Sequence, residues 1–168
     1  MDSCASKDGT DDIPEAYDFR TAYPNCVKEA RTTKLDCIAS SYALAALTAS
    51  EDRVCSKVDT QIKFSYEEIF DCDVTSKGCK GGEVTKVLGY GKRKGFVEEG
   101  CYPEPTGTCP EDHFLVNECR ANKNIYRIVD HCLATGVDDV KREILKNGPV
   151  LSMITPYTDF LVYSDGVY

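Results

Sequence analysis

The stretch Ser41-Tyr-Ala-Leu-Ala-Ala-Leu-Thr-Ala-Ser-Glu-Asp-Arg-Val54 decides the fold of this chain. Alanine and leucine have high helix propensity, and Leu44, Leu47 and Val54 recur near the spacing that places side chains on one helical stripe. Serine at position 41 is a favoured N-cap, because its hydroxyl accepts a hydrogen bond from an otherwise unpaired amide. We therefore predict a core helix over residues 41–54.

Further helices and strands are predicted downstream. The pattern Ser65-Tyr-Glu-Glu68 is a capping box, which begins a helix. A helix is expected over residues 83–94, where a glycine ends it, and another over residues 137–146, where Asn-Gly-Pro follows. Strands are expected later, at residues 125–129 and 150–155. Helices first and strands late indicate an α+β class.

Composition excludes several classes of protein. Hydrophobic residues make up 42% of the 168 residues, which is typical of a globular chain. The net charge of -8 argues against a nucleic-acid partner, which needs a basic patch. No apolar run is long enough to span a bilayer. Residues 1–12 are polar and lack the apolar centre of a signal peptide, so we expect a mobile leader there and a signal already removed.

Ten cysteines are the strongest compositional feature. Their number is even, no pair has the C-x-x-C spacing of a zinc ribbon, and His113 and His131 lie in no ligand pattern. The sequence therefore predicts disulfides, no metal and no cofactor. It also predicts an oxidising compartment, which means a secreted, lysosomal or vacuolar protein.

Five short segments resemble the papain family of cysteine proteases and, within it, the cathepsin B-like members. Residues 17–26 resemble the family's F-D-A-R-x-x-W-P-x-C pattern, and residues 28–31 resemble the approach to the oxyanion glutamine. Residues 78–82 resemble G-C-N-G-G. Residues 146–150 resemble N-G-P-V, and residues 157–168 resemble Y-x-D-F-x-x-Y-x-x-G-V-Y. Because they occur in the family's order, the chain is identified as a member.

The resemblance implies a papain-like fold. It assigns residues 13–124, with a disulfide-stapled loop, to a complete helical left domain. Residues 125–168 become the start of a β-barrel right domain that is only partly present. The resemblance also implies the disulfides Cys26–Cys55 and Cys37–Cys79. The pairing of the other six cysteines stays open: Cys4, Cys72, Cys101, Cys109, Cys119 and Cys132.

The catalytic positions depart from the family pattern. The family's nucleophilic cysteine lies at the N-terminus of the central helix, where the helix dipole stabilises a thiolate. Counting back without gaps from Asp52-Arg-Val-Cys55, which resembles S-D-R-I-C, places Ser41 at the nucleophile position. Counting forward from residues 28–31 places Thr33 where the oxyanion glutamine belongs. A serine hydroxyl is far less acidic than a thiol, so it would need a general base.

An alternative assignment makes Cys37 the nucleophile, because Ile-Ala-Ser follows it. This assignment needs a four-residue insertion in a continuous helix and takes one partner from an even set of cysteines, so we interpret Cys37 as a disulfide cysteine. The family's histidine and asparagine lie in G-G-H-A and N-S-W motifs, and the sequence to Tyr168 contains neither. We interpret His113 and His131 as surface residues.

Three functions remain open from the sequence. The leading hypothesis is a non-catalytic protease homologue that acts as a structural or protein-binding module, because nucleophile, base and oxyanion donor are all missing. The alternatives are one chain of a two-chain peptidase, with histidine and asparagine on another polypeptide, and a protease decoy or inhibitor. Gly81 and Gly82 resemble glycines that pair with an extended substrate, and they fit a turn beside Cys79 equally well. A protein partner or second chain is expected to cover three apolar side chains: Val150, Met153 and Leu161.

Overall fold

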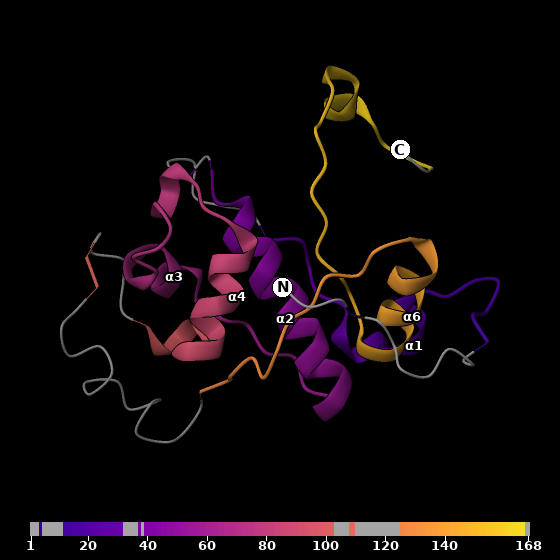
Figure 1. The fold of residues 1–168 in the computed structure, drawn as a ribbon, viewed down its shortest axis with the longest axis horizontal. Helices are drawn as coiled ribbons and strands as arrows, with labels where there is room; N and C mark the ends of the chain where they lie inside the picture. Colours follow the sequence, from indigo (N-terminus) through magenta and orange to yellow (C-terminus); the bar gives the residue numbers. More distant parts are fainter. Residues whose placement is uncertain are drawn as a thin grey trace.

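The computed structural model describes residues 4, 12–31, 37, 39–102, 108–109 and 125–166. Within these ranges the regular structure is helical (Figure 1). Thr33, His113 and most of the predicted leader at residues 1–12 lie outside the described residues. The α-helices are α1 (Phe19–Ala22), α2 (Ser41–Val58), α3 (Tyr66–Cys72), α4 (Val84–Arg93) and α6 (Val137–Asn147). The 3-10 helices are η1 (Pro24–Cys26), η2 (Gly78–Lys80), η3 (Glu99–Cys101) and η4 (Thr158–Val162).

Helix α2 confirms the predicted core helix and is longer than expected. It ends where Asp59 adopts the left-handed conformation (φ 52°) and donates its N–H to the Cys55 carbonyl at 2.7 Å. The predicted N-cap at Ser41 is wrong. Ser40 holds the cap position, with a helical backbone and no side-chain cap hydrogen bond, so Ser41 is the first helical residue.

The capping box at the start of α3 is half confirmed. The Ser65 hydroxyl accepts a hydrogen bond from the Glu68 amide at 3.2 Å, as predicted. The Glu68 carboxylate bonds outside its own helix, because it accepts from the Tyr90 hydroxyl at 3.0 Å and from the Val97 amide at 3.2 Å. This buried glutamate therefore ties α3 to α4 and to the segment after α4. Helices α4 and α6 also lie where the sequence predicts them.

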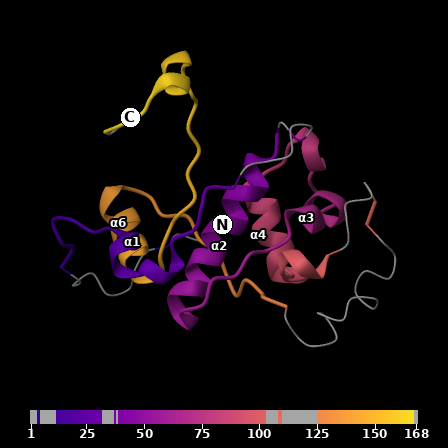
Figure 2. The same ribbon diagram turned by 180° about the vertical axis from the view of Figure 1, so that it is seen from behind.

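The core forms where α2 packs against α3 and α4 (Figures 1 and 2). Gly82, two residues before α4, lies against the Tyr42 ring at the start of α2, so the two helices begin side by side. Aromatic and aliphatic side chains from the helices and from the segments after α2 and α4 fill the interior. The largest are Leu47, Phe64, Ile69, Val87 and Phe96, all at most 1% exposed.

The two predicted strands are wrong within the described residues. In residues 125–129, Tyr126 forms a single antiparallel bridge with Phe96, through N–H···O contacts of 2.8 and 3.0 Å. Residues 150–155 have no regular secondary structure. A strand needs a neighbouring backbone to pair with, and the described residues place only a short stretch beside Tyr126.

The C-terminal part of the chain divides into an anchored helix and an exposed arm. Arg53 of α2 donates to Glu143 of α6 at 3.0 Å and to the carbonyl of Pro149, just after α6, at 2.9 Å. Beyond this anchor every residue from 152 to 166 is exposed, and we call this segment the C-terminal arm. In Figure 1 the arm is the yellow segment that rises away from the helices.

Candidate functional site at the start of helix α2

Ser41, which the sequence resemblance predicts at the family's nucleophile position, lies at the exposed first position of α2. The N-terminus of this 18-residue helix carries partial positive charge. The neighbouring Cys37–Cys79 disulfide ties the segment before α2 to η2, and the Ala39 amide donates to the Cys79 carbonyl at 3.4 Å. The geometry therefore presents a hydroxyl at a place suited to an activated thiol.

Gly81 and Gly82 lie beside this helix start and have clear structural roles. Gly81 has φ 113°, a conformation that side chains rarely tolerate. At Gly82 an added Cβ would lie 2.4 Å from the Tyr42 ring, so a side chain does not fit. Tyr42 is buried, which raises its pKa, and its hydroxyl donates to the Gly78 carbonyl at 3.1 Å. These contacts support the turn interpretation of the two glycines.

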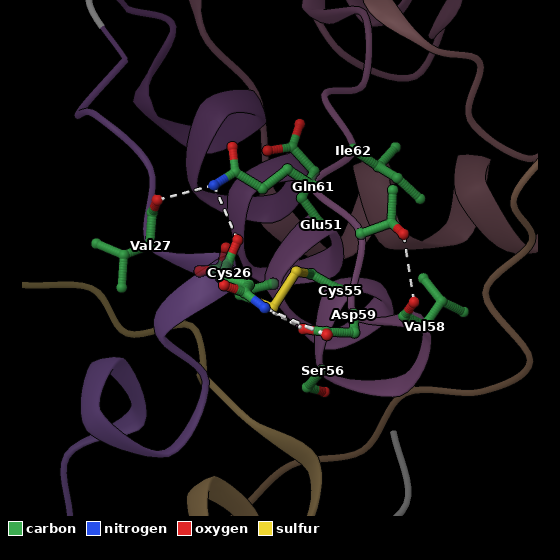
Figure 3. Close-up of a disulfide and its surroundings, with 12 residues drawn as sticks. Cys26, Val27, Glu51, Cys55, Ser56, Val58, Asp59, Gln61 and Ile62 are labelled. Carbon is green, nitrogen blue, oxygen red and sulfur yellow. Dashed lines mark hydrogen bonds between the residues drawn. A yellow bond between two sulfur atoms is a disulfide. The ribbon is translucent and has the colours of Figure 1, made fainter.

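The predicted disulfides are confirmed. Cys26 is bonded to Cys55 and Cys37 to Cys79. Figure 3 shows the first bridge, where Gln61 adds hydrogen bonds from its amide to the carbonyls of Asn25 and Val27 at 2.9 and 3.0 Å. The bridge at Cys37 rules out the alternative in which Cys37 supplies a nucleophilic thiolate.

The structure also pairs four cysteines whose partners the sequence left open. Cys4 is bonded to Cys132 and Cys72 to Cys109. Glu143 lies within 4.8 Å of the Cys4 and Cys132 sulfurs, a grouping that resembles a metal site. The sulfurs bind each other, however, and Glu143 is already paired with Arg53. Metal binding needs thiolates, so this oxidised cluster does not fit a metal.

A buried cluster of charges lies on the inner face of α2, and sequence reasoning missed it. Glu51 is 1% exposed and binds Arg31 at 2.7 Å and Lys28 at 3.0 Å. Its carboxylate also accepts from the Phe64 amide at 2.6 Å. The signal was present, because Glu51 continues the spacing of Leu44 and Leu47, and a carboxylate in an apolar stripe needs cationic partners.

His131 and Ser41 lie beside opposite ends of α4. Asp130, its neighbour, binds Lys92 at 2.9 Å in the last turn of α4. Ser41 lies near the beginning of α4, and the helix rise from Val84 to Lys92 spans about 12 Å. His131 is half-buried, not the surface residue that the sequence predicted. Its placement gives Ser41 no adjacent histidine base.

The sequence pattern of the family described as papain family cysteine protease matches residues 13–168. The chain belongs to this family. Cathepsin B of Dictyostelium discoideum is 29% identical over 93% of this chain and 55% of its own length. Cathepsin B-like cysteine proteinase 4 of Caenorhabditis elegans is 28% identical over 94% of this chain and 57% of its own. The papain-like fold is supported by the structure of procathepsin B S9 from Trypanosoma congolense, with a TM-score of 0.65 and 24% identity over 82% of this chain and 50% of that one.

The chain spans about half the length of the curated relatives it matches. Its disulfides and its cathepsin B homologues fit a secreted or lysosomal compartment. In the part of the chain that the structure describes, no helix is both long and apolar enough to cross a membrane.

Proposed function

We propose that this papain-family chain is a non-catalytic, cathepsin B-like homologue that acts as a structural or protein-binding module. The observation that carries the proposal is Ser41 at the exposed first position of α2, where the family resemblance places the nucleophile. Cys37 does not replace it, because its sulfur is bonded to Cys79. Thr33 in place of the oxyanion glutamine is part of the same proposal.

The physical reason is the acidity of the side chain. A helix N-terminus stabilises a nearby anion by about 0.3–1 kcal/mol, and one pKa unit corresponds to about 1.4 kcal/mol. The dipole of α2 therefore lowers a pKa by less than one unit, which is far too little to ionise a serine hydroxyl. A general base would have to take the proton, and His131 lies toward the other end of the helix pair.

The C-terminal arm supplies the proposed protein-binding surface. Met153 is 88% exposed and Leu161 is 82% exposed, whereas Val150 at the base of the arm is half-buried. Apolar side chains gathered on one exposed segment are typical of an interaction site. We assign the arm to a protein partner or second chain that adds to the right domain, residues 125–168. Gly81 and Gly82 form a second, groove-like candidate surface, because Gly82 leaves its backbone exposed.

A second candidate is one chain of a two-chain peptidase, with the histidine and asparagine on another polypeptide. The observation in its favour is the similarity to cathepsin B and cathepsin B-like cysteine proteinases. Ser41 argues against it, because a partner that brings a base would still meet a hydroxyl at the nucleophile position. A protease decoy would use the same surfaces as the leading proposal.

A peptidase assay tests the proposal with three proteins: the natural chain, Ser41→Cys and, as the matched control, Ser41→Ala. We expect no turnover of cathepsin-type peptide substrates above the Ser41→Ala background by any of them, because the proposal places Thr33 at the oxyanion position and His131 does not lie beside Ser41. Inhibitor-sensitive turnover by the natural chain would overturn the proposal. Turnover by Ser41→Cys, with or without an added second polypeptide, would show that base and oxyanion donor are in place.

A further inference from the structure

Two pairs of adjacent residues have a side chain that can react with the following backbone amide. Asn147 precedes Gly148 at the end of α6, and Asp165 precedes Gly166 in the C-terminal arm. In both pairs the glycine nitrogen can attack the side-chain carbonyl carbon of the preceding residue and close a five-membered succinimide ring. Glycine favours this attack, because it has no Cβ and lets the backbone approach closely. Whether each pair reacts therefore depends on how the fold holds it.

The Asp165–Gly166 pair is open to solvent, and its reacting groups lie together. Both residues are exposed, and a Cβ added at Gly166 would meet no atom within 4 Å. The Gly166 amide donates to Oδ1 of Asp165 at 2.8 Å, so the nitrogen lies beside the carboxyl carbon that it must attack. Holding two reacting groups at contact distance removes part of the entropic cost of a reaction. The arm therefore presents this pair in a conformation close to ring closure.

The Asn147–Gly148 pair is held away from the same reaction. The Gly148 amide donates to the Ile144 carbonyl at 3.0 Å, so its N–H points back along α6. The side-chain amide of Asn147 donates to the Glu143 carboxylate at 3.0 Å. Gly148 is buried, and a Cβ added to it would lie 3.3 Å from the Phe19 ring. Ring closure here requires both hydrogen bonds to break and the end of α6 to open first.

We propose that Asp165–Gly166 is a site of spontaneous isoaspartate formation and that the fold shields Asn147–Gly148 from the corresponding reaction. The Gly166 nitrogen forms a bond to Cγ of Asp165. The proton from this nitrogen and the hydroxyl of the carboxyl group leave together as water. A second water molecule then attacks the ring at the former main-chain carbonyl and breaks its bond to nitrogen. The chain now continues through the side-chain methylene, a free α-carboxylate remains beside it, and the overall composition is unchanged.

The product alters the arm without changing its charge. Isoaspartate adds one methylene group to the path of the main chain, so the backbone on either side of position 165 has to follow a new course. The arm is the segment assigned above to a protein partner. The isomerisation does not depend on that assignment, because ring closure uses only the side chain of Asp165 and the amide of Gly166.

Incubation of the full chain at neutral pH and physiological temperature tests the proposal, with one sample folded and one reduced and unfolded in guanidinium chloride. Peptide mapping with electron-transfer fragmentation identifies isoaspartate at position 165. A small mass increase reports conversion of the Asn147 amide to a carboxyl group. Each pair is compared with itself, so intrinsic differences between aspartate and asparagine cancel. We expect isoaspartate at 165 to form at rates within about twofold in the two samples, and Asn147 to convert at least roughly tenfold more slowly in the folded chain.

Asp165→Glu is the matched control, because it keeps the negative charge but would have to close a six-membered ring. In this variant the isoaspartate signal at 165 should be absent and Asn147 should behave as in the natural chain. Asp8–Gly9 lies outside the described residues, and peptide mapping separates any product there. Absence of isoaspartate at 165 from the folded natural chain would overturn the proposal. Conversion of Asn147 at equal rates in the folded and unfolded chains would overturn the shielding.

Discussion

The helices α2, α3 and α4 with the segments between them, which we call the body, contain apolar residues similar to those of the C-terminal arm. These side chains are buried in the body and exposed in the arm. In the body, Leu47 and Phe64 are fully buried between α2, α3 and the segment that follows α2. In the arm, Met153 and Leu161 are more than four-fifths exposed. Because the amino acids are alike, the difference comes from the presence or absence of packing partners. The body is held by its own contacts, and we propose that the exposed side chains of the arm bind a protein partner.

The largest expected effect of a single change is in the charged cluster of the body. Glu51→Ala should lower the free energy of unfolding by about 3–5 kcal/mol, because Arg31 would stay largely buried without its carboxylate partner and Lys28 would keep only Asp52, at 3.3 Å. Urea denaturation followed by circular dichroism measures this loss. Asp130→Ala is the control, because it removes an exposed ion pair with Lys92 and should leave the midpoint unchanged. Equal effects of the two substitutions would show that burial of the cluster does not determine its contribution.

A smaller loss is expected where α4 begins beside α2. Gly82→Ala places a methyl group 2.4 Å from the Tyr42 ring, and such overpacking costs about 1–3 kcal/mol. Gly100→Ala is the matched control, because a Cβ there meets no atom within 4 Å. Denaturation midpoints of the two variants provide the comparison. A Gly82→Ala chain as stable as the Gly100→Ala chain would contradict the tight contact between Gly82 and Tyr42.

The smallest effect on stability is expected in the arm. Met153→Ser should change the free energy of unfolding by less than about 0.5 kcal/mol, because the side chain is 88% exposed. The same substitution should weaken association with a partner, or self-association, if the arm is the binding surface. Urea denaturation of the natural and substituted chains measures the stability, and sedimentation velocity measures the association. A natural chain that stays a well-folded monomer at high concentration and binds no second polypeptide would contradict the role of the arm.

The parts of the fold that depend on local sequence were predictable. Alanine-rich residues 41–54, the Ser65 cap and the glycine after α4 each act on their own helix, and the structure confirms those helices. The predicted N-cap at Ser41 was wrong by one position, because the two adjacent serines make the boundary ambiguous. The expected strands at residues 125–129 and 150–155 failed, since a strand depends on a partner distant in sequence.

The candidate site was predicted through the family resemblance more than through local pattern. The resemblance gave Cys37–Cys79 and placed Ser41 at the start of α2, both as the structure has them. The Cys4–Cys132 pairing could not be predicted from the sequence, because the two cysteines are 128 residues apart and Cys4 lies outside the family pattern. The packing of Tyr42 against Gly82 was also unpredictable, because it joins α2 to the segment before α4, about 40 residues later in the sequence.

The central claim is that the chain has no nucleophilic thiolate at the start of α2. The most direct measurement is the intact mass of the folded, oxidised chain after incubation with an electrophilic peptide probe that alkylates active-site cysteines of papain-family enzymes. We predict that the mass stays that of the unlabelled chain, both alone and with an added second polypeptide. A stoichiometric mass increase that maps to Cys37, or to Ser41 itself, would contradict the claim.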